Sequence, residues 1–319
     1  MEGSFSVDGI SPTSLAHIFG QRNVVDQVRT ALDAADMDHT KMESALLVGP
    51  PGLGKSTTAR VIAHEMAATF HEVLGQSLTD RSDLNGILLS MRHKDVFHID
   101  EAHELRKRLQ TALNLAIDRK RVIVNWGVSP LNCPIADFTL LLSTTDEDRV
   151  LQPLRERMQL VLRFDYCSTE DLIRLLDCRC RSLGWTTAKD VVEGIARRCQ
   201  GTPRLALRLL QGCYRVSRAE GETDETAITV SHFRRACELT MIDDLGLGPN
   251  ERKYLELLRD GGGRLNVVAS SLGLPARTVS DVVEPYLIRS GLVVKDDQCR
   301  RLLTAAGREH LSNSCQGGV

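Results

Sequence analysis

Eight consecutive residues from Gly49 to Ser56, Gly-Pro-Pro-Gly-Leu-Gly-Lys-Ser, have the types and spacing of a phosphate-binding loop. Its glycines allow backbone N–H groups to curl around phosphate oxygens, and a helix starting near Lys55 would add the positive end of its dipole. In this pattern Lys55 brings a positive charge to the β- and γ-phosphates, and Ser56 offers an oxygen to Mg²⁺. A simple Gly/Pro-rich turn is the alternative, but the complete match between a strand-like and a helix-like run favours nucleotide binding.

An acidic pair, Asp100-Glu101, ends the apolar run from Val96 to Ile99. An aspartate at a strand end can complete the coordination of Mg²⁺, and the adjacent glutamate can polarise an attacking water. The alternative is a solvated acidic pair that caps a helix, but a position at the end of an apolar run favours hydrolysis. The neighbouring His98 and His103 are interpreted as structural.

Hydroxyl and guanidinium groups follow further along the chain. The apolar run from Phe138 to Leu142 ends in Ser143-Thr144-Thr145, whose hydroxyls could bind the γ-phosphate, a water or simply cap the strand. Pro153-Leu-Arg-Glu-Arg157 and Gly201-Thr-Pro-Arg204 supply arginines. A planar guanidinium suits the charge of phosphoryl transfer better than an ammonium group, although a lone arginine is more often part of a surface ion pair.

Three kinds of element are needed to position these residues. Strand-like runs at 45–48, 96–99 and 138–142 alternate with helical patterns, which predicts a parallel α/β sheet with its ligand site at the carboxyl ends of the strands. From about Ser168 leucines recur at helical spacing, with no strand-like run before Asp243. After Gly246, helical patterns precede two short strand-like pieces, 291–294 and 301–304, as in a winged helix. We therefore expect an ATPase domain at residues 1–165, an all-helical lid at 166–242 and a winged-helix domain at 243–319.

Composition restricts the partners of such a chain. Its 319 residues are 42% hydrophobic and 26% charged, which is typical of a folded multidomain protein. A net charge of −2 excludes a protein that coats nucleic acid by bulk positive charge, and 4% aromatic residues are too few for a groove that stacks unpaired bases. The segment Met1–Ile10 lacks the features of a signal peptide, and no apolar run is long enough for a membrane span. The nine cysteines lack paired spacing, so we expect reduced thiols, a cytoplasmic location and no membrane contact.

The order of these motifs resembles that of the AAA+ ATPases and, within them, the RuvB family of Holliday-junction branch-migration motors. The finer resemblance runs from about Ser11 to Leu311 and rests on Phe19-Gly20-Gln21, GPPGLGKST, HIDEAH, FTLLLSTT, PLRER, GTPR and EPYLIRSGL. It implies an ATP-driven DNA helicase or translocase that migrates Holliday junctions in recombination and repair. The implied partners are duplex DNA at a four-way junction, a RuvA-like protein and further copies of the chain, in a ring that is hexameric in the family.

The resemblance also implies a role for each matching residue. The ATP-binding positions are Gly49, Pro50, Gly52, Gly54, Lys55, Ser56, Thr57, Arg157 and Arg204. Ser56 and Asp100 would bind Mg²⁺, and Asp100 with Glu101 forms the Walker B pair. The sensor 1 residue is Thr144 or Thr145, of which we assign Thr145 to the catalytic set.

Two arginines and the wing complete the implied roles. Arg157 resembles an arginine finger that reaches the ATP of a neighbouring subunit, and Arg204 resembles sensor 2, which reports the nucleotide state to the lid. Lys295 and Arg300 fall where the family places the basic residues that contact DNA.

Several segments depart from the family pattern: Ser11-Pro12 replaces Arg-Pro, HIDEAH replaces FIDEIH, STTDEDRV replaces the ATTRAG segment, and Gln200 replaces the arginine before GTPR. Asp296 and Asp297 lie between the two basic residues of the wing, and the segment from Asp118 to Asp137 is shorter than the family's RuvA-docking hairpin. Two alternatives therefore stay open. One is a divergent RuvB-like nucleotide switch or clamp-loader-like assembler without branch migration, and the other is a transcriptional regulator whose winged helix reads sequence.

Overall fold

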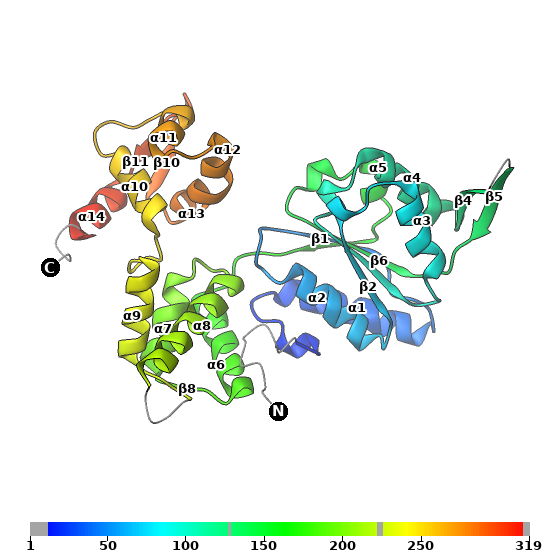
Figure 1. The fold of residues 1–319 in the computed structure, drawn as a ribbon, viewed down its shortest axis with the longest axis horizontal. Helices are drawn as coiled ribbons and strands as arrows, with labels where there is room; N and C mark the ends of the chain where they lie inside the picture. The colour runs from blue at the N-terminus through cyan, green and yellow to red at the C-terminus, as the bar shows by residue number, and fades with distance from the viewer. Residues whose placement is uncertain (1–11, 127–128, 222–225, 315–319) are drawn as a thin grey trace. The chain divides into compact units, whose positions relative to one another are not determined.

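The structure is a computed structural model that describes residues 12–126, 129–221 and 226–314 (Figure 1). The chain divides into two compact units. The first comprises the residues up to Gly184 together with Gly201–Arg208, and the second comprises Trp185–Gln200 and the residues from Leu209 onward. The division into three domains at residues 165/166 and 242/243 stays a prediction. The expected absence of an export signal concerns Met1–Ile10, which lies outside the described residues.

The first unit is built on a parallel five-stranded sheet, as the sequence predicts. Its strands, in spatial order, are β2 (Phe70–Leu74), β3 (Val96–Asp100), β6 (Thr139–Thr144), β1 (Ala45–Val48) and β7 (Leu160–Arg163). The register pairs Val48 with Thr144 and Leu74 with Asp100. The carboxyl ends of β1, β3 and β6 therefore meet at one edge of the sheet, where the three polar motifs follow.

Helices cover both faces of this sheet (Figure 1). Helices α1 (Arg22–Met37) and α2 (Lys55–Glu65) pack on the face that carries Leu47, Val96 and Leu141. The opposite face carries Leu46, Phe97 and Leu142, and it packs against α3 (Arg81–Ser90), α4 (Lys107–Arg119) and α5 (Gln152–Arg155). Because alternate residues of a strand point to opposite faces, a sheet covered on both sides requires continuous apolar runs, which these strands have.

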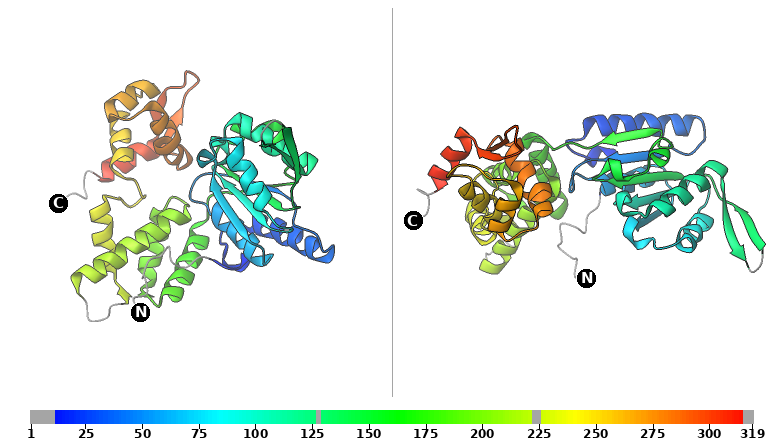
Figure 2. Two further views of the ribbon diagram at one scale, coloured as in Figure 1. Left: turned by 45° about the vertical axis from the view of Figure 1, so that its right-hand side comes forward. Right: turned by 90° about the horizontal axis from the view of Figure 1, so that it is seen from above.

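A β-hairpin projects from the sheet domain beside α3 and α4 (Figure 2). It consists of β4 (Arg121–Trp126) and β5 (Ser129–Pro134), which pair antiparallel. The side-chain amide of Asn85 on α3 donates a hydrogen bond to the carbonyl of Ile123, 3.1 Å away. Ile123 and Leu131 are 57% and 54% exposed, so the hairpin presents apolar side chains to solvent.

Helices dominate the chain after the sheet. In the first unit, α6 (Thr169–Leu183) begins at the N-cap Ser168, whose hydroxyl accepts a hydrogen bond from the backbone N–H of Asp171. Helices α7 (Lys189–Arg198), α8 (Pro203–Glu220) and α9 (Val230–Thr240) follow. The expectation of no strand before Asp243 is wrong in one detail, because β8 (Thr186–Thr187) and β9 (Ala227–Ile228) pair in parallel. Two-residue strands are too short to produce an alternating sequence pattern.

The end of the chain has the order of a winged helix, as predicted. Helices α10 (Pro249–Leu257), α11 (Leu265–Leu272) and α12 (Ala276–Thr278) come first, and a π-helical turn at Val279–Val283 leads into α13 (Glu284–Arg289). The wing is the antiparallel pair β10 (Val293–Lys295) and β11 (Arg301–Leu303). A final helix, α14 (Ala305–Ser314), was not expected from the sequence.

A buried ionic cluster fastens the wing to α13. Glu284 is 1% exposed, and its Oε1 and Oε2 accept hydrogen bonds from Nε and NH2 of Arg301 at 2.7 and 3.1 Å. The hydroxyl of Tyr254 donates to the same carboxylate at 2.8 Å, and Lys295 Nζ lies 3.1 Å from Oε2. Burial raises the pKa of Glu284, but the hydrogen bonds from Arg301, Tyr254 and Lys295 together lower it by more. The net shift of the pKa is therefore downward.

We expect Arg301→Ala to lower the free energy of unfolding of the winged-helix region by about 3–5 kcal/mol, because it leaves the Glu284 carboxylate buried without its main partner. Since the folded-state pKa of Glu284 is lowered, its contribution to stability is present above the ordinary glutamate pKa and is lost as pH falls through the folded value. Urea unfolding at neutral and acid pH measures both effects. The control is the adjacent exposed Arg300→Ala, which should change stability by less than about 0.5 kcal/mol. Equal losses for the two variants would contradict the assignment.

Candidate active site

The phosphate-loop motif forms the expected strand–loop–helix turn between β1 and α2. Gly49, Gly52 and Gly54 have φ of 153°, 79° and 95°, which are conformations that favour glycine. A Cβ at Gly49 would lie 2.5 Å from the carbonyl oxygen of Phe164, and one at Gly52 would lie 2.9 Å from Thr202 Cγ2. Gly49 and Gly52 are therefore required both by the backbone turn and by the chain packed against it, and Gly54 by its backbone conformation alone.

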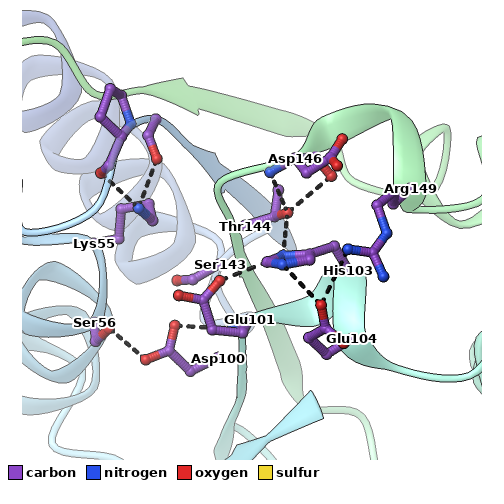
Figure 3. Close-up of polar contacts among 12 residues, drawn as sticks. Lys55, Ser56, Asp100, Glu101, His103, Glu104, Ser143, Thr144, Asp146 and Arg149 are labelled. Carbon is purple, nitrogen blue, oxygen red and sulfur yellow. Dashed lines mark hydrogen bonds and ion pairs between the residues drawn. The ribbon is translucent and has the colours of Figure 1, made fainter. Parts of the chain in front are cut away.

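The lysine and serine at the start of α2 reach two different groups (Figure 3). Lys55 is buried, and its Nζ donates to the carbonyls of Gly49 and Pro50 at 2.7 and 2.9 Å. Burial lowers the Lys55 pKa, against the opposing charges of Glu101 and Asp100. Ser56 Oγ donates to Asp100 Oδ2 at 2.7 Å, which joins the phosphate loop to the acidic pair as the sequence predicts. Thr57 is half-buried one position further along α2.

The Ser56 and Asp100 oxygens fit a magnesium ion. Adjacent oxygen ligands of an octahedral Mg²⁺ lie about 3 Å apart, and Mg²⁺ prefers hydroxyl, carboxylate and phosphate oxygens. The separation of 2.7 Å between the two side-chain oxygens is close to that spacing. A small shift of either side chain would let both oxygens bind one ion.

Glu101 lies in a strained turn. Its φ is 49°, in the left-handed region that is uncommon for residues other than glycine. Its Oε2 is buried and has no hydrogen bond among the described residues, although His103 Nδ1 lies 3.3 Å away. Strain and an unsatisfied buried oxygen are typical of a functional position held by its surroundings.

Gly75 at the end of β2 supports this turn, because a Cβ there would lie 2.5 Å from the carbonyl oxygen of Glu101. We expect Gly75→Ala to displace Glu101, to lower ATP turnover about tenfold and to lower the free energy of unfolding by about 1–3 kcal/mol. Steady-state turnover and urea unfolding measure the two effects. Gly86→Ala is the control: it lies in α3 with nothing within 4 Å of the new Cβ, so it should be neutral or stabilising. Unchanged turnover in Gly75→Ala would contradict the support role.

The two threonines at the end of β6 differ in environment. Thr144 is buried, and its hydroxyl contacts the backbone N–H and carbonyl of Asp146 at 3.0 Å and His103 Nδ1 at 3.2 Å. Thr145 is exposed beyond the strand end. The Thr144 hydroxyl is thus engaged within the protein, whereas the Thr145 side chain faces solvent.

His103 is the residue whose position the sequence reasoning did not identify. Its Nδ1 lies between Glu101 and Thr144, and its Nε2 is 3.3 Å from Glu104, which accepts a hydrogen bond from Arg149 NH1 at 3.0 Å (Figure 3). The imidazole therefore contacts residues at the carboxyl ends of both β3 and β6, where the predicted catalytic residues lie. Its place two residues after Glu101 was the available signal, but a lone histidine does not reveal its contacts.

The two arginine motifs lie at different places in the first unit. The backbone N–H of Arg204 donates to the carbonyl of Gly52 at 3.3 Å, so the GTPR segment packs on the phosphate loop. Arg157 instead forms an ion pair with Asp118 at 2.6 Å and is half-exposed. It lines a cavity with Ser44 and Phe138, which directly precede β1 and β6. Arg157 is thus at the amino ends of the strands, at the edge opposite the phosphate loop of its own chain.

The expected DNA-contacting residues lie on the wing. The Lys295 side chain is 41% exposed, and its Nζ forms an ion pair with Glu284. The Arg300 side chain is exposed and donates a hydrogen bond to the carbonyl of Gly261 at 3.4 Å. Asp296 Oδ1 accepts hydrogen bonds from the backbone N–H groups of Gln298 and Arg300 at 3.0 and 2.7 Å. Asp296 therefore shapes the turn of the wing.

A parallel sheet with a phosphate loop after β1, an acidic pair at the end of β3 and a winged helix later in the chain defines a P-loop ATPase of the AAA+ class. Residues 10–164 match the family model of the Holliday junction DNA helicase RuvB P-loop domain, and residues 244–312 match that of the RuvB C-terminal winged helix domain. The chain belongs to the RuvB family.

Individual relatives agree with this assignment over nearly the whole chain. The Holliday junction branch migration complex subunit RuvB of Thermotoga maritima is 35% identical over 314 residues, which cover 96% of this chain and 92% of the relative. The corresponding protein of Solibacter usitatus is 36% identical and covers 89% and 84%. Among solved structures, the Thermotoga maritima RuvB Holliday junction branch migration motor has a TM-score of 0.81 at 33% identity, covering 94% of this chain and 97% of that one.

Two further findings concern the environment of the chain. Eight cysteines lie within the described residues, and all eight are free thiols. In the same part of the chain, no helix is both long and apolar enough to cross a membrane.

Proposed function

We propose that this protein is an ATP-driven motor that migrates the branch point of Holliday junctions during recombination and repair, as a hexameric ring with a RuvA-like partner. The observation that supports the proposal is that the predicted catalytic residues lie at two opposite edges of the sheet. Lys55, Ser56, Asp100 and Glu101 converge at the carboxyl edge of the sheet, while Arg157 lies at the amino edge. A ring in which each subunit turns its amino edge to the neighbour's ATP would complete the site.

Within one subunit, the phosphate loop and Lys55 would bind the phosphates of ATP, with Lys55 Nζ moving from the loop carbonyls to the phosphate oxygens. Ser56 and Asp100 would hold Mg²⁺, which neutralises charge on the phosphates when it is bound. Glu101 would polarise the attacking water, and Thr145 would contact the γ-phosphate or that water. Arg204, already packed on the phosphate loop, would report the nucleotide state to the helical region.

The remaining surfaces support the proposed partners. The exposed apolar side chains Ile123 and Leu131 would contact the RuvA-like protein, and Lys295 with Arg300 would contact duplex DNA. Several weak wings in one ring give useful avidity while each can still release the duplex. The free thiols of the described cysteines support a cytoplasmic location.

Salt-dependent DNA binding tests the proposed wing contacts. The logarithm of the affinity for a four-way junction should fall linearly with the logarithm of salt concentration, and Lys295→Ala or Arg300→Ala should each reduce the slope by about one. Arg29→Ala, on the exposed surface of α1, is the control and should leave the slope unchanged. A slope insensitive to both wing variants would contradict the wing contact. A large affinity ratio between different DNA sequences would instead support a transcriptional regulator.

One observation favours the second candidate, a RuvB-like nucleotide switch or clamp-loader-like assembler without branch migration. The buried Glu284 carboxylate already binds Lys295, which reduces the positive charge that the wing offers to phosphate. A junction-migration assay separates the two candidates, because a switch would hydrolyse ATP without moving the junction.

A further inference from the structure

A line of polar side chains crosses the face of the sheet beneath α2. Arg60 on α2 donates to Glu72 Oε2 on β2 at 2.6 Å. Glu72 Oε1 is 3.1 Å from Nδ1 of His98 on β3, and His98 Nε2 is 2.8 Å from Ser143 Oγ on β6. Since β2, β3 and β6 are neighbours in the sheet, one continuous path of hydrogen bonds joins the phosphate-loop helix to three strands.

This line is buried in apolar surroundings at its inner end. His98 and Ser143 are both 0% exposed, among side chains such as Ala59, Val96 and Leu141. The ring of Phe70 stacks on that of His98 with 5.8 Å between centroids. A polar group in such a place is costly unless it is hydrogen-bonded, so each member depends on the next for its partner.

The charge of Glu72 fixes the direction of one of these hydrogen bonds. The hydrogen bond with His98 lowers the pKa of Glu72, against its partial burial, and Arg60 lowers it further, so Glu72 is an ionised acceptor. His98 Nδ1 therefore donates to Glu72, and the Ser143 hydroxyl, which can donate or accept, is the partner of His98 Nε2.

The His98–Ser143 contact lies directly beside the catalytic strand ends. His98 is two residues before Asp100, and Ser143 is two residues before Thr145. The paired register between β3 and β6 ends at Ile99 and Leu142, so the side-chain contact crosses this last pair diagonally, from His98 before it to Ser143 after it. Any change in the spacing of these two strands would move Asp100 and Glu101 relative to Thr145.

We propose that His98 and Ser143 are positioning residues for ATP hydrolysis, which hold the Walker B carboxylates, Thr145 and, through Glu72 and Arg60, helix α2 in a fixed arrangement. The inference rests on the proposed ATPase site. Both side chains are fully buried, so their proposed role is indirect. Their effect is on the spacing of the catalytic groups, and a catalytic geometry that is wrong by 1 Å can cost a factor of about 100 in rate.

The test compares Ser143→Ala and His98→Phe with Thr139→Val. Thr139 is a matched control because it is buried on the same strand and its hydroxyl donates to the Met42 carbonyl at 2.7 Å, at the far end from the site. Ser143→Ala and Thr139→Val each lose one buried hydrogen bond and should lose similar thermal stability, whereas His98→Phe loses two and should lose more. Ser143→Ala and His98→Phe should lower kcat for ATP between about tenfold and a hundredfold with little change in the ATP dissociation constant, whereas Thr139→Val should keep kcat.

The double variant His98→Phe with Ser143→Ala gives a second readout. Both residues act through one hydrogen bond, so the double variant should lose no more kcat than the more affected single variant. A kcat in Ser143→Ala and His98→Phe equal to that of Thr139→Val would overturn the proposal and leave the line as packing alone. A lack of ATP turnover in the unaltered protein would instead contradict the proposed ATPase function, so the two failures are distinguishable.

Discussion

Glu101→Gln is expected to bind ATP with unchanged affinity and to hydrolyse it about 10²–10⁴-fold more slowly, the range typical for loss of a positioned general base. The glutamine keeps the shape of the side chain but cannot accept a proton from water. The position of Glu101 supports this role. Its strained turn holds the carboxylate near Lys55 and Asp100, with one buried oxygen that has no hydrogen bond among the described residues.

Nucleotide binding and single-turnover hydrolysis measure the two effects separately. Glu43→Gln is the control: it removes one exposed carboxylate of the same domain and should leave both quantities unchanged. Lys55→Ala should lose ATP binding itself, because it removes the charge that the phosphate loop places on the phosphates. Wild-type turnover in Glu101→Gln would show that another group activates the water.

Arg157→Ala should lower hydrolysis about 10³–10⁵-fold, the range for an arginine that stabilises phosphoryl-transfer charge. In the proposed ring, the position of Arg157 at the amino edge of the sheet places this loss at the ATP of a neighbouring subunit. Mixing Arg157→Ala subunits with Lys55→Ala subunits should therefore restore some turnover. The Lys55→Ala subunit cannot bind ATP but keeps an intact Arg157, which it can present to the functional site beside it.

The ion pair between Arg157 and Asp118 allows a second variant to be tested. Asp118→Asn weakens this ion pair but keeps Arg157, so mixing Asp118→Asn subunits with Lys55→Ala subunits should still give turnover. Arg29→Ala, which also removes an exposed arginine from an ion pair, is the control and should hydrolyse ATP normally. Absence of any restoration in the mixture, with both variants folded and assembled, would contradict action between subunits.

Local sequence patterns predict the parts of this protein in which the residues that bind the ligand also set the backbone conformation. The glycines of the phosphate loop are needed both for its φ values and for phosphate binding, so a single motif predicts both the turn and the binding site. The strand ends at Asp100 and Thr144 can be predicted to within one or two residues, because each apolar run stops at polar residues. The existence of β10 and β11 follows from short apolar pieces on either side of a polar turn, but their ends differ from the predicted 291–294 and 301–304 by up to two residues.

Contacts between distant segments are what the sequence does not reveal. Gly75 supports the Glu101 turn from the segment after β2, and Glu284 joins Tyr254, Lys295 and Arg301 only after folding. His98 has the sequence appearance of an isolated polar residue in an apolar strand, because its partners lie 26 and 45 positions away. The placement of Arg157 at the edge opposite Lys55 likewise depends on the direction of β1 and β6 in the folded sheet.

Junction migration with purified components tests the central proposal most directly. The protein is incubated with a synthetic four-way junction, ATP and Mg²⁺, with and without a RuvA-like protein, and the conversion of the junction to duplex products is measured. We expect ATP-dependent migration that is stimulated by the partner and is abolished in Glu101→Gln. Full ATP turnover without migration in the presence of the partner would contradict the proposed motor and favour a nucleotide switch.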